Sequence, residues 1–259
     1  MARAIWKGVL QLGESGVPVK LYSAVQDQGV HFRLLNARKR EPVKQRMVNP
    51  DTGKPVPAEE VRKGFEVEPG TFVMLEEDEL AELEPEASRD IEVAQFVPRG
   101  AVPHAWFDRP YYLGPDSDAA DYFALARALQ AEASAGIATW VMRNQDYAGA
   151  LLSHGDHLML VTLRHVGEVV PASALPAPAG RKADEREVRM ATQLVQALEG
   201  EFDIASFRDE YRDRVLELVQ AKAAGQPIEV RKYEPKQPED TLSNLLKASL
   251  NTARERKVA

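Results

Sequence analysis

Three side chains within four residues of this sequence could bind a metal ion. His154, Asp156 and His157 lie in the run HGDH, and imidazole and carboxylate groups are common ligands of divalent metals. A metal-dependent hydrolase that uses these three residues is therefore one hypothesis. Gly155 and Asp156 are also typical of a tight turn that leads into a strand. The pattern favours the structural turn, and we expect no metal site and no catalytic residue.

A second group of side chains could bind an anion. Residues 31–63, which we call the strap, read HFRLLNARKREPVKQRMVNPDTGKPVPAEEVRK and hold nine basic and four acidic residues, in a chain of net charge −7. The prolines and the Asp-Thr-Gly run predict an extended, turn-rich segment. Such an array of cations suits a polyanion better than a small ligand. The candidate phosphate-binding residues are one strand lysine and nine strap cations: Lys20, Arg33, Arg38, Lys39, Arg40, Lys44, Arg46, Lys54, Arg62 and Lys63.

The charge of the chain is segregated along its length. Residues 1–64 carry twelve basic and six acidic side chains, a net of +6, whereas residues 65–92 carry one basic and eleven acidic, a net of −10. A protein that binds DNA needs positive potential only on the surface that faces the phosphates, because salt screens charge beyond about 8–10 Å. The overall negative charge therefore does not exclude nucleic acid. Two solvated faces of an ordinary domain are the alternative.

Composition limits the remaining classes. The 259 residues are 44 % hydrophobic and include no cysteine, so a sizeable core is expected and disulfides and thiolate zinc sites are excluded. Lys7 and Gly8 interrupt the first apolar run, so we expect no signal sequence, no membrane association and a cytoplasmic location. The sequence contains no P-loop, HExxH or GxSxG motif. We therefore expect neither an enzyme nor a cofactor.

Hydrophobic periodicity predicts a mixed α+β, β-rich chain. Strands are expected at residues 3–12, 17–25, 65–75 (as a hairpin), 89–97, 106–113, 137–142 and 158–163. Helices are expected at residues 76–84, 122–134, 185–199 and 206–224, with one or two helical turns at 145–152 and a last short helix that begins at Thr241. A Pro/Ala-rich linker at residues 171–180 separates the β-rich part from the helical end.

The order of these motifs resembles the prokaryotic Ku proteins, the DNA-end-binding family of bacterial non-homologous end joining. The strings that carry the resemblance are IWKG (5–8), VPVKLYSA (17–24), GFEVEPGTFVML (64–75), SRDIEVAQFV (88–97), FDRPYYLGPD (107–116), HGDHLMLVTLR (154–164) and EFDIASFRDEYRDRVLELVQAKAAG (201–225). Each string is weak alone. Together, in the family order, they cover residues 3–225.

The resemblance implies a Ku-type β-barrel core with an extended bridge and a C-terminal helical arm. Residues 1–180 would form the core, with the strap in or beside the bridge. Residues 181–225 would form the arm, used for dimerisation or packing, and 226–259 a short tail with an amphipathic helix. The implied function is sequence-independent binding of linear double-stranded DNA ends by a ring-shaped homodimer that recruits and stimulates the ATP-dependent DNA ligase D. The location would be the bacterial cytoplasm, at the nucleoid.

The sequence departs from the family in two places. Some relatives carry a Cys pair where this chain has MVNPDTGK at residues 47–54, so a zinc-stabilised knuckle is excluded here. The long Lys-rich tail of some relatives is absent, since residues 226–259 hold seven basic and five acidic side chains, a net of +2. A protein-interaction barrel without a DNA role is the alternative function. It predicts no salt-sensitive affinity for DNA.

Overall fold

The computed structural model describes residues 3–117, 119–176 and 180–225. The chain forms two compact units. One comprises Met1–Gln28 and Phe32–Ala174, and the other comprises Gly29–His31 and Leu175–Ala259. The predicted tail at 226–259, with the helix expected from Thr241, lies outside the described residues.

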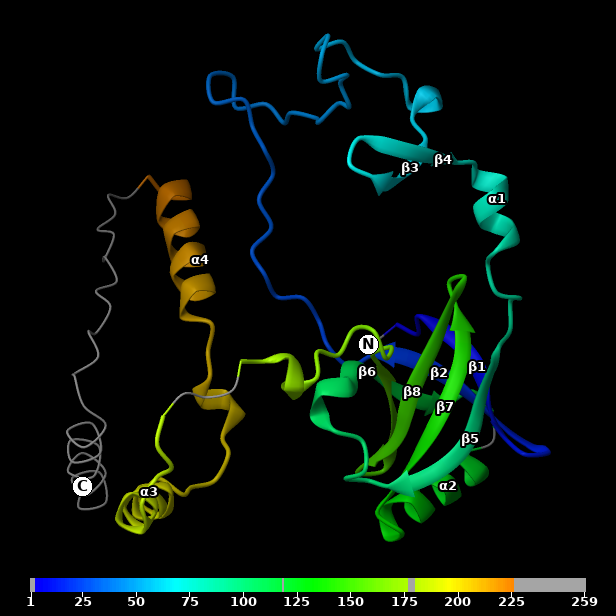
Figure 1. Cartoon of the computed structure of the whole chain (residues 1–259), viewed down its shortest axis with the longest axis vertical. Coiled ribbons are helices and arrows are strands. Elements are labelled where there is room, and N and C mark those ends of the chain that lie inside the picture. The colour runs from blue at the N-terminus through cyan, green and yellow to red at the C-terminus, as the bar shows by residue number, and fades with distance from the viewer. Residues whose placement is uncertain (1–2, 118, 177–179, 226–259) are drawn as a thin grey trace. The chain divides into compact units, whose positions relative to one another are not determined.

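The first unit contains a closed seven-stranded barrel (Figure 1). The order around the barrel is β1-β2-β6-β9-β8-β7-β5, and a parallel pairing of β1 with β5 closes it, whereas all other neighbours are antiparallel. The strands are β1 (Trp6–Leu12), β2 (Ser15–Ser23), β5 (Asp90–Pro98), β6 (Phe107–Pro115), β7 (Ser134–Met142), β8 (Gln145–His154) and β9 (His157–Leu163). The predicted fold class, β-rich and mixed α+β with a barrel core, is confirmed.

Alternating side chains fill the barrel interior. In β2, Val17, Val19 and Leu21 are buried, while the residues between them are at least partly accessible, as the two-residue period of a strand requires. Helix α2 (Ala120–Ala131) packs against β7, β8 and β9 (Figure 1). Its Tyr122 belongs to the same hydrophobic core as the strands. The barrel is therefore a packed core and not a channel.

Strand β8 corrects one prediction. Residues 145–152 were expected to form helical turns, and this is wrong, because β8 continues the sheet from β7 through a two-residue turn at Arg143 and Asn144. Both turn residues have positive φ, 54° and 59°, as in the type I′ turns that match the twist of paired strands. The alanines and glycine that suggested a helix are small for another reason. A Cβ at Gly149 would lie 2.6 Å from Cζ3 of Trp140.

The chain between β2 and β5 contains the strap and a hairpin. The strap is irregular apart from a 3-10 turn at Ala58–Glu60 and the isolated bridges Leu35↔Pro42 and Val48↔Pro55. The predicted hairpin is present as β3 (Lys63–Glu68) and β4 (Thr71–Leu75), which form a separate two-stranded sheet. The short helix α1 (Glu77–Glu82) follows, and another 3-10 turn (His104–Trp106) precedes β6.

The second unit contains the helical arm. After a 3-10 turn at Ala172–Ala174, the arm comprises α3 (Glu185–Ala197), a 3-10 turn at Ile204–Ser206 and α4 (Glu210–Ala223). The caps explain where the helices begin. Asp184 accepts a hydrogen bond from the backbone N of Glu187. Asp209 accepts from the backbone N of Arg212, so α4 begins four residues later than the apolar periodicity predicted.

Candidate nucleic-acid interface

The first basic cluster of the strap lies on a tight turn formed by residues 36–41. Oδ1 of Asn36 accepts hydrogen bonds from the backbone N of Arg38 at 2.9 Å and of Lys39 at 3.1 Å. The backbone N of Asn36 donates to the carbonyl of Glu41 at 2.9 Å, and the N of Arg40 donates to the carbonyl of Asn36 at 2.7 Å. The asparagine side chain therefore organises the backbone, and the three cations remain directed to solvent.

A second turn of the strap, residues 49–54, has the same construction. Oδ1 of Asn49 accepts from the backbone N of Asp51 and of Thr52, both at 3.0 Å. The N of Asn49 donates to the carbonyl of Lys54 at 2.9 Å, and the N of Gly53 donates to the carbonyl of Asn49 at 2.8 Å. This is the segment in which family resemblance excluded a zinc knuckle. Backbone and amide hydrogen bonds hold it instead.

Eight of the ten candidate residues are exposed and form no ion pair within the part of the chain that the structure describes. They are Arg33, Arg38, Lys39, Arg40, Lys44, Arg46, Lys54 and Lys63. Cations without a carboxylate partner keep their full charge for an external anion. That they bind phosphate stays a prediction.

The other two candidates have acidic partners. Nζ of Lys20 lies 2.5 Å from Oδ1 of Asp116, whose Oδ2 also lies 3.1 Å from Nζ of Lys7. The hydrogen bond from Asp116 raises the pKa of Lys20, and the same lysine holds the pKa of Asp116 below its usual value. Nε of Arg62 lies 3.2 Å from Oε2 of Glu76. Periodicity could not reveal these partners, because Asp116 follows β6 and is remote from Lys20 in sequence.

The HGDH motif forms the turn of the β8–β9 hairpin. His154 pairs with His157 in the sheet register, and Gly155 has a φ of 58°. The centroids of the two imidazole rings lie 6.0 and 6.5 Å from that of Tyr112. Among the described residues, no three or more His, Asp or Glu side chains are placed to share a metal ion. The geometry of these residues is that of a structural turn.

The β3–β4 hairpin carries an apolar surface that charge analysis did not predict. Phe65, Phe72 and Met74 are 66 %, 62 % and 68 % exposed. In the register, Phe65 is opposite Val73, and Phe72 is opposite Glu66, so the two phenylalanines lie on opposite faces of the two-stranded sheet. A two-stranded hairpin is only marginally stable alone in water. The alternation of apolar residues near residue 65 was the available signal of a surface that needs cover.

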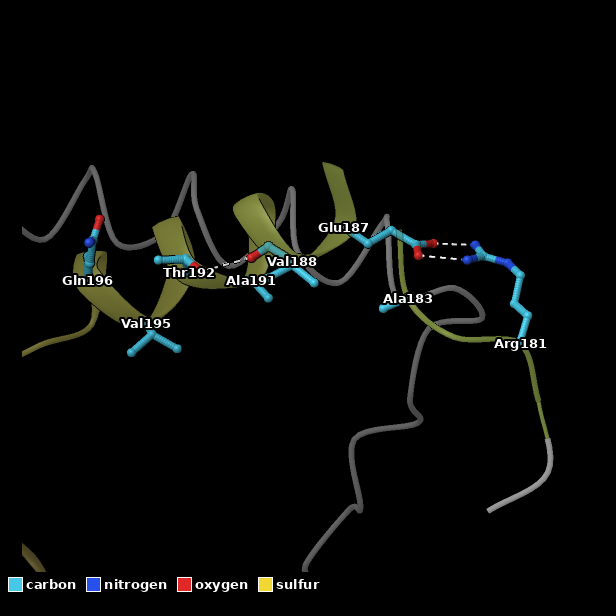
Figure 2. A pocket seen from close by; sticks show the side chains of 8 residues that line it. All are labelled: Arg181, Ala183, Glu187, Val188, Ala191, Thr192, Val195 and Gln196. Atoms are coloured by element: carbon cyan, nitrogen blue, oxygen red, sulfur yellow. Dashed lines mark hydrogen bonds and ion pairs between the residues drawn. The ribbon is translucent and has the colours of Figure 1, made fainter. Parts of the chain in front are cut away.

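The helical arm has an open pocket along α3 (Figure 2). Its volume is about 810 Å³. Two hydrogen bonds join the guanidinium of Arg181 to the carboxylate of Glu187 at one end, as Figure 2 shows, and they lower the pKa of Glu187 to about 2. The described residues that line the pocket are Arg181, Ala183, Glu187, Val188, Ala191, Thr192, Val195 and Gln196. Its floor is apolar, and Val188 and Val195 remain exposed.

The helices were also compared with the requirements of a membrane span. Within the described segments of the chain, none is long and apolar enough to cross a bilayer.

Comparison with known proteins gives a consistent result. The family model described as the Ku70/Ku80 beta-barrel domain matches residues 11–190. "Non-homologous end joining protein Ku 2" of Geotalea uraniireducens is 38 % identical over 224 residues, which are 86 % of this chain and 87 % of that protein. "Non-homologous end joining protein Ku" of an Anaeromyxobacter species is 38 % identical over 99 % of this chain and 88 % of its own length. The protein of the same name from Pseudomonas aeruginosa is 34 % identical over 97 % and 89 %.

Proposed function

Because this chain belongs to the Ku family, we propose that it binds the ends of double-stranded DNA in bacterial non-homologous end joining, without reading base sequence. The observation that carries the proposal is the strap, whose eight unpaired cations are concentrated in a chain of net charge −7. Contacts to phosphate position a protein on DNA and carry no sequence information directly. Affinity then comes from counterion release and falls steeply with salt.

The binding form is a homodimer. One chain has one strap, which cannot encircle a duplex, whereas two straps related by a two-fold axis can close a ring. The exposed apolar side chains of the β3–β4 hairpin, among them Phe65 and Phe72, support this step, because a second copy would cover them. The dimer interface would then include the hairpin that directly follows the strap in sequence.

A preformed ring gives a topological mechanism. The duplex enters where it ends and is held by phosphate contacts around its circumference, so a DNA end is recognised without any base contact. The loaded ring then recruits the ATP-dependent DNA ligase D. The helical arm is the docking surface in this proposal, because Val188 and Val195 on α3 leave an apolar face exposed beside the pocket. This chain itself performs no chemical step.

The decisive test is a gel-shift titration on open and blocked DNA. The duplex has about 40 base pairs, roughly 140 Å at 3.4 Å per step, and in the second sample both ends carry bulky protein blocks. Binding to the open duplex alone is the expected result. Equal binding to both samples would refute threading and leave ordinary phosphate affinity. No salt-sensitive binding to either sample would favour a protein-interaction barrel.

The dimer is tested separately by analytical ultracentrifugation. The variant Phe72→Glu places a charge on the exposed hairpin and is expected to shift the protein toward monomer while the barrel stays folded. Val170→Glu is the matched control, since Val170 is exposed at 73 % outside the hairpin. If Phe72→Glu sediments as the wild-type dimer, the hairpin is not the interface.

A further inference from the structure

The strap consists largely of one eleven-residue unit that occurs twice. Residues 33–43 read RLLNARKREPV and residues 46–56 read RMVNPDTGKPV. Both units begin with arginine, have asparagine in the fourth position and end with Pro-Val. The internal similarity is modest in letters, but its fixed positions are those that form the turn.

The two units also share their hydrogen bonds. Beyond the asparagine-centred bonds described above, the backbone N of Val43 donates to the carbonyl of Leu34 at 3.0 Å, and the N of Val56 donates to that of Met47, also at 3.0 Å. An isolated bridge closes each unit at the same place, Leu35↔Pro42 and Val48↔Pro55. The two turns are thus one backbone structure with two sets of side chains.

One backbone position distinguishes the sets. The fifth residue of the six-residue turn is Gly53 in the second unit, with a φ of 65°, and Arg40 in the first, with a φ of 58°. Glycine adopts this left-handed conformation at no steric cost, whereas the Cβ of arginine is disfavoured there. The first turn therefore keeps a cation at a position where its own copy has the conformationally favoured residue.

The neighbouring positions differ in the same sense. Arg38 and Lys39 correspond to Asp51 and Thr52 of the second turn. The first turn thus presents three consecutive exposed cations, and the second presents an anion, a hydroxyl and a glycine. Backbone strain at a single position, retained with a charged side chain, is typical of sites where the side chain is used.

Building on the proposed function, we propose that the first turn, residues 36–41, is the part of the strap that contacts DNA phosphates, and that the second turn, residues 49–54, is a structural copy that does not. Arg38, Lys39 and Arg40 would each contact a phosphate. The second turn would hold the strap in shape and contribute little to affinity.

The equivalence of the turns permits an exchange experiment at constant composition. The first variant carries the second turn's residues at 37–40: Ala37→Pro, Arg38→Asp, Lys39→Thr and Arg40→Gly. The second variant carries the first turn's residues at 50–53: Pro50→Ala, Asp51→Arg, Thr52→Lys and Gly53→Arg. The third combines both sets and has the amino-acid composition and net charge of the wild type. Each graft uses residues that the chain already accommodates in this backbone.

Affinity for an open duplex is measured by gel shift between 50 and 200 mM salt. For three lost phosphate contacts per strap, the slope of log affinity against log salt falls by about 2.7, and affinity at 0.1 M salt falls by about two orders of magnitude. We expect this loss in the first variant and also in the combined variant. Wild-type affinity in the combined variant would overturn the inference, because total charge and not location would then decide binding.

The outcomes separate this inference from the function on which it rests. If the wild type does not bind DNA ends, the proposed function fails before any exchange is tested. If the wild type binds ends and the first variant binds equally well, only the inference fails. The single variant Arg40→Gly covers the case in which a graft does not fold. It relieves the left-handed arginine, so thermal stability should not fall, while the salt slope decreases by about 0.9 per strap.

Discussion

Removing one hydroxyl group from the barrel, in the variant Tyr122→Phe, should cost far more stability than its size suggests. Tyr122 is 1 % exposed. Its hydroxyl donates to the carbonyl of Leu113 at 2.5 Å and accepts from the backbone N of Leu158 at 2.8 Å. Leu113 and Leu158 are the last register partners of β6 and β9. The hydroxyl therefore joins two neighbouring strands and ties α2 to them.

The expected magnitude follows from the two backbone groups that lose their partner. Leaving a buried donor or acceptor unsatisfied costs about 1–3 kcal/mol each, so the free energy of unfolding should fall by about 2–4 kcal/mol once local relaxation is allowed for. For a unit of this size the melting temperature changes by roughly 2–4 °C per kcal/mol, which predicts a decrease of about 5–15 °C.

The measurement is urea unfolding followed by tryptophan fluorescence. Tyr147→Phe is the matched control, because that hydroxyl bonds to Oε1 of Gln145 at an exposed position, and its loss should cost less than about 0.5 kcal/mol. Equal effects of the two substitutions would refute the bridging role of Tyr122.

The same residue predicts a dependence on pH. Burial raises the pKa of the Tyr122 phenol above the ordinary value of about 10 that applies in the unfolded chain. Its contribution is fully present below pH 10 and is lost as the pH rises from there through the folded-state pKa. This alkaline loss of stability should be smaller in Tyr122→Phe than in the wild type. Equal alkaline profiles for both proteins would contradict the assignment.

Three further outcomes are expected. Gly149→Ala places a Cβ 2.6 Å from the Trp140 ring and should destabilise the barrel by about 1–3 kcal/mol in thermal unfolding. Lys20→Gln should weaken DNA binding in a gel shift less than twofold, because Asp116 already neutralises that lysine; a loss as large as that of the first-turn graft would place Lys20 on the DNA. The pKa of Glu187, about 2, lies below its ordinary value, so its contribution to the arm is present at neutral pH and lost as the pH falls from about 4.5 toward 2. Far-UV circular dichroism should therefore show a smaller acid loss of helicity in Glu187→Gln.

The strands were predictable wherever inward and outward residues alternate. In β2, apolar side chains at Val17, Val19 and Leu21 alternate with accessible ones, and the pattern alone indicates a half-buried strand. Strand β8 failed for a physical reason. The ring of Trp140 occupies the space beside Gly149, so the strand needs small residues, and a run of small residues also favours helix. Only the pairing with β7 reveals that requirement.

The candidate site was predictable as a charged segment but not residue by residue. Composition identified the strap, and the resemblance to Ku indicated what it would bind. The ion pairs of Lys20 and Arg62 depend on Asp116 and Glu76, and such partners are brought close by folding and not by spacing. The repeated unit was visible in the letters, yet its meaning depends on hydrogen bonds that make two dissimilar hexapeptides structurally equivalent.

The division of labour between barrel and strap has a measurable consequence. The barrel interior is filled by core side chains, and all of the strap's predicted phosphate ligands are exposed. A substitution in the barrel, such as Tyr122→Phe, should therefore lower the free energy of unfolding and leave the salt slope of DNA binding unchanged. A substitution in the first turn, such as Arg40→Gly, should do the reverse. If the two quantities instead change together in both variants, the strap and the barrel act as one cooperative unit, and DNA affinity depends on the stability of the whole frame.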